Sequence, residues 1–144
     1  KRVIKFLQKV HQAGLENIRM LHLNSDRLFD KHIAPGSVEH LFVNFPDPWP
    51  KRRHSKKRFI ARERLKTAVK LLAPGGGFSL RTDARDYALE ALDNLEARED
   101  LENCFSTGEW APSPLYPFET PYEIKFKAQS LRIYYFEYRK RAET

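Results

Sequence analysis

The residues best suited to chemistry lie in a proline-rich loop, residues 44–50 with the sequence NFPDPWP, which directly follows a mostly apolar run. Prolines on both sides of Asp47 restrict the backbone, so its carboxylate has few conformations open to it. A loop of this stiffness can hold a reacting group in one position. The pattern predicts a positioned acidic group.

A basic segment follows this loop at once. Six of the eight residues from 51 to 58 are Lys or Arg, in a chain of 144 residues with a formal net charge of +7. A local concentration of charge indicates a polyanionic partner more strongly than an even surplus would. Cations on the following helix extend the charge, although a solvated basic face is the simpler interpretation for them. The residues predicted to contact a nucleic-acid backbone are Arg52, Arg53, Lys56, Lys57 and Arg58.

Hydrophobic periodicity places both segments in an alternating pattern of helices and strands. Asp83 is the expected N-cap of the helix that follows it, and residues 74–77 (PGGG) are interpreted as a helix C-cap and tight turn. We expect the other helices over residues 1–13, 28–33 and 60–72, and strands over residues 18–23, 38–45, 78–82, 101–106 and 131–138.

This alternation predicts a single α/β domain over residues 1–144, built on a doubly wound, mostly parallel sheet. The last two strands are expected to pair antiparallel at one edge of the sheet. Ligands of such sheets bind at the carboxyl ends of the strands. Residues 24–26, 44–58 and 82–86 are therefore the segments expected to form a site.

Composition excludes several classes of protein. Cys104 is the only cysteine, which rules out an intrachain disulfide and favours a reduced, cytoplasmic protein. No apolar run approaches the roughly 20 residues of a membrane span, and no signal peptide precedes the first helix. His54 has no neighbours at metal-ligand spacing, so no metal site is predicted.

Residues 46–51 (PDPWPK), with 53–54 (RH) and 56–58 (KKR), resemble the signature of the TrmB family of tRNA (guanine-N7-)-methyltransferases. Two weaker motifs agree with it, Thr82-Asp83 and the segment 120–123 (TPYE). The resemblance covers nearly the whole chain. It implies a class I, Rossmann-like methyltransferase fold, S-adenosylmethionine as the cofactor, and a tRNA substrate whose target guanine lies in the variable loop.

The resemblance also implies roles for individual residues. Asp47 would be the active-site carboxylate beside the cofactor, and Asn24 would contact the cofactor near its adenosine. Pro121 stands where the family usually has a basic residue, which removes a cation and an N–H donor. The residues that the resemblance implies as substrate contacts are Lys51, Asp83, Thr120, Pro121, Tyr122 and Glu123.

The implied reaction needs no general base, because guanine N7 carries an in-plane lone pair and no proton. Asp47 would instead hydrogen-bond the N1–H and the exocyclic amine of the purine, and stabilise the cation that forms. A base turned out of its stack usually gains an aromatic wall in exchange. Trp49, Tyr122 and Trp110 are the candidates, with packing in the loop or the core as the alternative for the two tryptophans.

One part of the family pattern is not found in these 144 residues. The resemblance implies an upstream strand, a Gly-rich turn and an acidic residue that bind the methionine and ribose parts of the cofactor. Residues 74–77 are no substitute, since they follow a helix and precede a strand. We therefore expect weaker cofactor binding, an unpaired flank on the strand at residues 38–45, and a tendency to form homo-oligomers.

Two other functions remain open at this point. One is a tRNA-binding chain without activity of its own, which the lack of the Gly-rich segment favours. The other is a methyltransferase of exocyclic amines, whose Asn/Asp-Pro-Pro-aromatic loop the segment at residues 44–49 loosely matches, although here Asp47 separates the two prolines.

Overall fold

The computed structural model describes residues 2–142 and contains a mixed, four-stranded sheet with the order β1-β2-β4-β3. Strands β1 and β2 are parallel, with β1 at the edge of the sheet, whereas β4 runs antiparallel to both of its neighbours. The predicted α/β fold, with antiparallel strands at its C-terminal end, is confirmed. The strands are β1 (Val38–Asn44), β2 (Leu72–Thr82), β3 (Leu101–Asn103) and β4 (Tyr134–Lys140).

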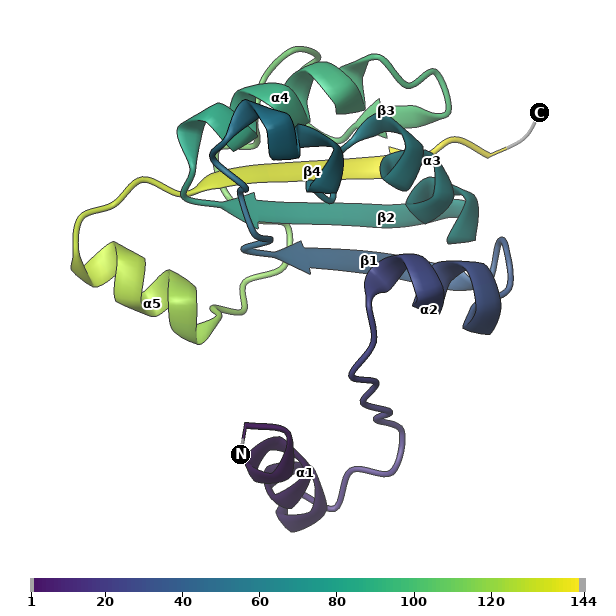
Figure 1. Cartoon of the computed structure of the whole chain (residues 1–144), viewed down its shortest axis with the longest axis vertical. Helices are drawn as coiled ribbons and strands as arrows, with labels where there is room; N and C mark the ends of the chain where they lie inside the picture. Colours follow the sequence, from purple (N-terminus) through teal and green to yellow (C-terminus); the bar gives the residue numbers. More distant parts are fainter. Residues whose placement is uncertain (1, 143–144) are drawn as a thin grey trace.

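The helices are distributed unevenly around this sheet (Figure 1). Two of them, α3 and α4, pack on the sheet, and α2 packs on α3. Helix α5 lies at the end toward which β1 and β2 point, and α1 stands apart from the sheet at the end of an extended segment (Figure 1). Their bounds are α1 (Arg2–Gln12), α2 (Ser25–His32), α3 (Arg62–Leu71), α4 (Arg85–Glu96), α5 (Pro121–Ala128) and a 3₁₀ helix η1 (Arg52–Lys57).

The two faces of the sheet differ in chemistry, because successive side chains of a strand point to opposite sides. On β2, Phe78 and Leu80 are fully buried in the hydrophobic core with Leu65 of α3 and Leu95 of α4. Ser79 and Arg81 alternate with them along the strand. Arg81 donates hydrogen bonds to the loop at residues 115–118, and Ser79 bonds to the side chain of His40. The helices therefore cover an apolar face, and this loop covers a polar one.

The strand predicted over residues 18–23 is not formed. These residues belong to no strand and pair with none in the described part of the chain. A strand is stabilised only when its backbone N–H and C=O groups meet a neighbouring strand. The apolar pattern alone cannot supply that neighbour, which is why this prediction was wrong.

The interpretation of residues 74–77 as a helix C-cap was also wrong. Helix α3 ends at its C-cap Leu72, and the glycines belong to the irregular first part of β2, opposite a register shift in β1 between Val38 and His40. A Cβ on Gly77 would overlap the imidazole of His40. Glycine at position 77 thus leaves the space that the His40 side chain occupies.

Asp83 is not a helix N-cap either. Helix α4 begins after Ala84, and the hydroxyl of Thr82 accepts the hydrogen bond from the Ala84 N–H at 3.2 Å. The carboxylate of Asp83 is exposed. Among residues 2–142, no helix combines the length and the apolar character that a membrane crossing requires.

Candidate functional site

The parallel pairing of β1 and β2 brings two of the three predicted site segments, residues 44–58 and 82–86, to the carboxyl ends of these strands. Asp47 follows the end of β1 and Asp83 follows the end of β2, and both carboxylates are exposed. Helix α5 packs at this end of the strands. The ring of Phe45 lies 5.4 Å from that of Phe126 and 6.0 Å from that of Tyr122. Two acidic groups and an exposed phenol therefore share one end of the fold.

The backbone of the loop after β1 is strained at two positions. Phe45 has φ +48° and Trp49 has φ +41°, a left-handed conformation that non-glycine residues rarely adopt. The Phe45 N–H donates to the Arg81 carbonyl at 2.8 Å, and Asp47 Oδ1 accepts from the Trp49 N–H at 3.1 Å. Such strain persists where the surroundings enforce it, often at functional sites. Asp47 is thus fixed in a turn that uses one of its two oxygens.

The side chain of Trp49 anchors this loop. Its ring packs edge-on against the imidazole of His54 at 5.4 Å, and the Lys57 ammonium lies 4.9 Å from the ring centre. Trp110 is likewise packed, with its ring 4.9 Å from that of Tyr134 beside the core. Of the three aromatic candidates for a wall, the exposed Tyr122 is the one that the structure favours.

The basic segment forms η1, from which several cations project. Lys51, Arg53, Lys56 and Lys57 are exposed, while the backbone of Arg52 begins the helix. Arg58 differs from the prediction. Its guanidinium is buried, pairs with Glu90 of α4 and donates to the Trp49 carbonyl at 3.1 Å. Because the chain turns inward after η1, Arg58 holds the loop instead of facing solvent.

We expect Arg58→Ala to lower the free energy of unfolding by about 1–3 kcal/mol, since it leaves the Glu90 carboxylate and the Trp49 carbonyl without their partner. Urea denaturation measures the effect. Lys56→Ala is the matched control two positions away, and as an exposed residue it should change stability by less than about 0.5 kcal/mol. Equal stability of the two variants would contradict the anchoring role.

The segment TPYE forms a capping box at the start of α5. The Thr120 hydroxyl accepts from the Glu123 N–H at 3.1 Å, and the Glu123 carboxylate reaches back to the Thr120 N–H at 3.5 Å. Pro121 occupies the first helical position, where the N–H has no partner in any helix. The absence of an N–H donor at Pro121, expected to matter for substrate contact, therefore costs the helix nothing.

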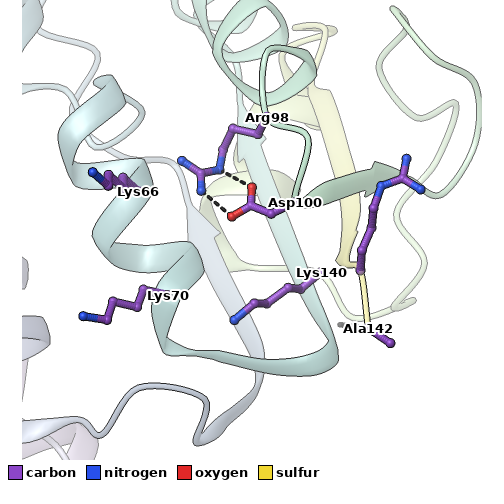
Figure 2. Close-up of a pocket in the computed structure, with 7 residues that line it drawn as sticks. Lys66, Lys70, Arg98, Asp100, Lys140 and Ala142 are labelled. Atoms are coloured by element: carbon purple, nitrogen blue, oxygen red, sulfur yellow. Dashed lines mark hydrogen bonds and ion pairs between the residues drawn. The ribbon is translucent and has the colours of Figure 1, made fainter. Parts of the chain in front are cut away.

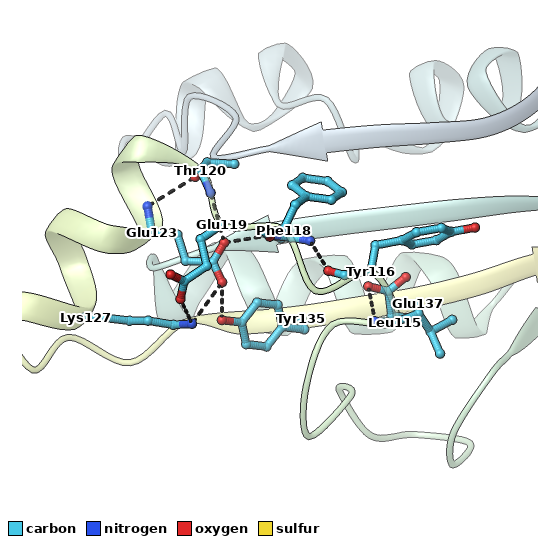
Figure 3. A network of polar contacts seen from close by, with 10 residues as sticks. Leu115, Tyr116, Phe118, Glu119, Thr120, Glu123, Lys127, Tyr135 and Glu137 are labelled. Carbon is cyan, nitrogen blue, oxygen red and sulfur yellow. Dashed lines mark hydrogen bonds and ion pairs between the residues drawn. The ribbon is translucent and has the colours of Figure 1, made fainter.

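Glu123 was expected to contact the substrate, but its side chain is fully buried. It accepts hydrogen bonds from Arg81 and from the Tyr135 hydroxyl, both at 2.6 Å (Figure 3). Burial opposes ionisation of the carboxyl, but the bonds from Tyr135 and Arg81 outweigh it and hold the pKa of Glu123 below its ordinary value. Glu123 therefore belongs to the structural support of α5.

Arg81 is the residue at the centre of this support. Its fully buried guanidinium donates to the Phe118 carbonyl at 2.7 Å and to the Tyr116 carbonyl at 3.1 Å, in addition to Glu123. It thus ties the covering loop and α5 to the strand that ends beside Asp83. Sequence reasoning missed Arg81, although a lone arginine inside an apolar strand was a signal that a buried partner exists.

A second polar row lies beside it on the same face. The imidazole of His40 and the hydroxyl of Ser79 are 2.7 Å apart, and Ser79 donates to Glu137. Burial raises the pKa of the Glu137 carboxyl, against the bonds from Ser79 and the Leu115 N–H. Tyr116 lies over the row, with its hydroxyl 3.3 Å from His40. These contacts fix the loop that Arg81 also holds.

Asn24 lies at the start of α2 as its N-cap, where its Oδ1 accepts from the Asp26 N–H at 3.0 Å. Asp26 pairs with Arg64 at 2.8 Å, and Arg64 also donates to the Lys57 carbonyl. The start of α2 is thereby tied to η1. The exposed Asn24 amide retains its N–H groups for other contacts.

The described residues do not form a complete cradle for S-adenosylmethionine. Residues 2–142 contain no Gly-rich turn between a strand and a following helix, because Gly75, Gly76 and Gly77 all lie within β2. Backbone N–H groups of such a turn are the usual partners of an anionic group in this fold class. The cofactor contacts that the resemblance implies for Asn24 and Asp47 stay predictions.

Comparison with known proteins assigns the chain to a family. A family model described as "Putative methyltransferase" matches residues 1–136. The chain is 36% identical over 135 residues to the tRNA (guanine-N(7)-)-methyltransferase of Alkalilimnicola ehrlichii, an alignment that covers 94% of this chain and 56% of that protein. It is 45% identical over 100 residues to the protein of the same name from Streptomyces coelicolor, covering 69% of this chain and 37% of that one.

The chain spans about half the length of the curated relatives it matches. Among solved structures, it is similar to a SAM-dependent O-methyltransferase from Thermotoga maritima, with a TM-score of 0.53 and 16% sequence identity. That match covers 95% of this chain and 45% of the other. At this level of identity, the similarity shows a shared fold.

Proposed function

Because this chain belongs to the TrmB family of tRNA (guanine-N7-)-methyltransferases, we propose that it acts in the transfer of a methyl group from S-adenosylmethionine to N7 of a guanine in tRNA. The observation that carries the proposal is the strained loop after β1, which fixes the exposed carboxylate of Asp47 at the carboxyl ends of the parallel strands. Ligands of such sheets bind at the carboxyl ends of the strands.

In this proposal Asp47 is an orienting group. Its Oδ1 is used by the Trp49 N–H, so Oδ2 is the oxygen available to the N1–H and exocyclic amine of the guanine. Fixing the purine in one orientation directs its N7 lone pair at the methyl donor. As the methyl group arrives, the ring becomes cationic, and the nearby carboxylate stabilises that charge.

The exposed ring of Tyr122 provides the surface against which the guanine can stack. It lies on the first turn of α5, and its ring is 6.0 Å from that of Phe45 and 5.9 Å from that of Phe126. Stacking on an aromatic side chain offsets the loss of base stacking in the RNA. The exposed carboxylate of Asp83, which directly follows β2, is an additional hydrogen-bond acceptor at this end of the sheet.

The exposed cations of η1 are proposed to contact the tRNA backbone, and salt dependence tests them. We expect simultaneous Ala substitution of Arg53, Lys56 and Lys57 to reduce the slope of log affinity against log salt by roughly 0.7–0.9 for each lost contact. The matched control replaces Lys5, Lys9 and Lys31, which are also exposed and form no ion pair within residues 2–142. Equal slopes for the two triple variants would mean that the basic segment is a solvated surface.

Nucleoside analysis tests the reaction itself. Unmodified tRNA is incubated with the protein and S-adenosylmethionine carrying a labelled methyl group, and the digested RNA is examined by mass spectrometry. The proposal expects label in 7-methylguanosine. Label in a base methylated on its exocyclic amine would instead support an amine methyltransferase.

One observation favours a second candidate function, tRNA binding without turnover by this chain alone. Residues 2–142 contain no Gly-rich turn between a strand and a following helix, whereas the cations of η1 are exposed. In that case tRNA would bind with a strong salt dependence, but calorimetry would detect no binding of S-adenosylmethionine. Cofactor binding in the micromolar range would exclude this candidate.

A further inference from the structure

A second concentration of positive charge lies at the opposite end of the sheet. A pocket of about 480 Å³ opens between the second half of α3 and the end of β4 (Figure 2). Five cations and one carboxylate line it, namely Lys66, Lys70, Arg98, Lys140, Arg141 and Asp100. Such an excess of cations is suited to an anionic ligand.

The single carboxylate of the pocket does not neutralise the cations around it. Asp100 is bound in a bidentate pair by Arg98, with distances of 2.8 and 2.5 Å. Lys140 is oriented by one hydrogen bond to the Leu72 carbonyl at 2.8 Å, which leaves two N–H groups on its ammonium. Lys66 and Lys70 lie on the exposed face of α3 and belong to no ion pair within residues 2–142.

The pocket adjoins a second hollow along α3. A neighbouring hollow of about 200 Å³ shares Lys66 and Arg98 with it and extends to Arg62, at the start of α3. Arg62, Lys66 and Lys70 are spaced four residues apart, which places them on one face of the helix. The charged side chains that line the two hollows are therefore cations, except for Glu63 and Asp100.

The pocket is far from the candidate methyl-transfer site. Tyr134, at the start of β4, pairs with Thr82 beside Asp83, and Lys140 lies six residues further along the strand. At about 3.4 Å per residue, the two ends are roughly 20 Å apart. One small ligand cannot occupy both, but the backbone of a folded RNA can span them.

We propose that this pocket binds backbone phosphates of the same RNA whose guanine lies at the carboxyl ends of β1 and β2, and so sets the orientation of the RNA along α3. The inference rests on the tRNA substrate of the proposed function. The cations are long, mostly exposed side chains distributed along a groove. Such an arrangement can contact successive phosphates of a nucleic-acid backbone, and these contacts do not depend on the base sequence.

The test replaces Lys66, Lys70 and Arg141 by Ala in this chain and measures tRNA binding by fluorescence anisotropy over a range of salt concentrations. We expect the slope of log affinity against log salt to fall by roughly 2 to 2.7, for three contacts of about 0.7–0.9 each. The Lys5, Lys9 and Lys31 triple variant is the control and should retain nearly the original slope. Circular dichroism checks that both variants are folded.

The possible outcomes separate this inference from the proposed function. If the unsubstituted chain binds tRNA and the pocket variant keeps its slope, the pocket contributes nothing and only this inference fails. If the unsubstituted chain does not bind tRNA, the proposed function fails with it. Titration with inorganic phosphate distinguishes a small-anion site, because submillimolar binding that the triple variant loses, together with an unchanged RNA slope, would overturn the RNA assignment.

Discussion

Replacing Asp47 by Asn is expected to reduce kcat for tRNA methylation by about 10²–10³, the usual effect of removing one positioned electrostatic group from a transition state. The Asn side chain keeps the Oδ1 that accepts from the Trp49 N–H, so the turn survives. Only the negative charge and the second acceptor oxygen are lost. Steady-state kinetics at saturating tRNA and S-adenosylmethionine, with a protein preparation that is active in tRNA methylation, measures the change.

Asp47→Ala provides the complementary variant, because it removes both the charge and the turn contact. If Asp47 acts as proposed, the two variants lose similar amounts of kcat and both retain most of their tRNA affinity. A normal rate for the Asn variant, with a loss confined to the Ala variant, would show that Asp47 shapes the loop and does not act on the purine.

Replacing Glu123 by Ala is expected to lower the free energy of unfolding by about 3–5 kcal/mol, because the fully buried Arg81 guanidinium is left without its counter-charge. That is a large part of the roughly 5–15 kcal/mol that stabilises an ordinary domain. Glu119→Ala is the matched control, since both carboxylates pair with Lys127 but Glu119 is exposed. Its expected cost is below about 1 kcal/mol.

The loss in Glu123→Ala should depend on pH in a definite direction. The pKa of Glu123 is lowered in the folded protein, so its ionised form contributes stability that is present above the ordinary Glu pKa, about 4.3. That contribution disappears as the pH falls through the lowered value. Urea denaturation at pH 7 and in the acid range should therefore show the two proteins converging below about pH 4, and a pH-independent difference would contradict the ion pair.

The sequence determined the elements that local pattern controls. Apolar residues at helical spacing predicted α3 and α4, and the apolar run at residues 38–45 predicted β1. Proline chemistry around Asp47 predicted a constrained loop, which the turn to the Trp49 N–H confirms. These predictions succeeded because periodicity and proline geometry act over a few neighbouring residues and require no distant partner.

Only the tertiary structure decided the contacts that need a distant partner. Within one basic run, Arg58 is buried against Glu90 while Lys57 is exposed, a difference that depends on where α4 packs. Glu123 became a structural residue because Arg81, 42 positions away, lies beneath it. Residues 18–23 have a strand pattern but no neighbour to pair with. Burial of charge and strand pairing are settled by packing, so composition and spacing alone left them open.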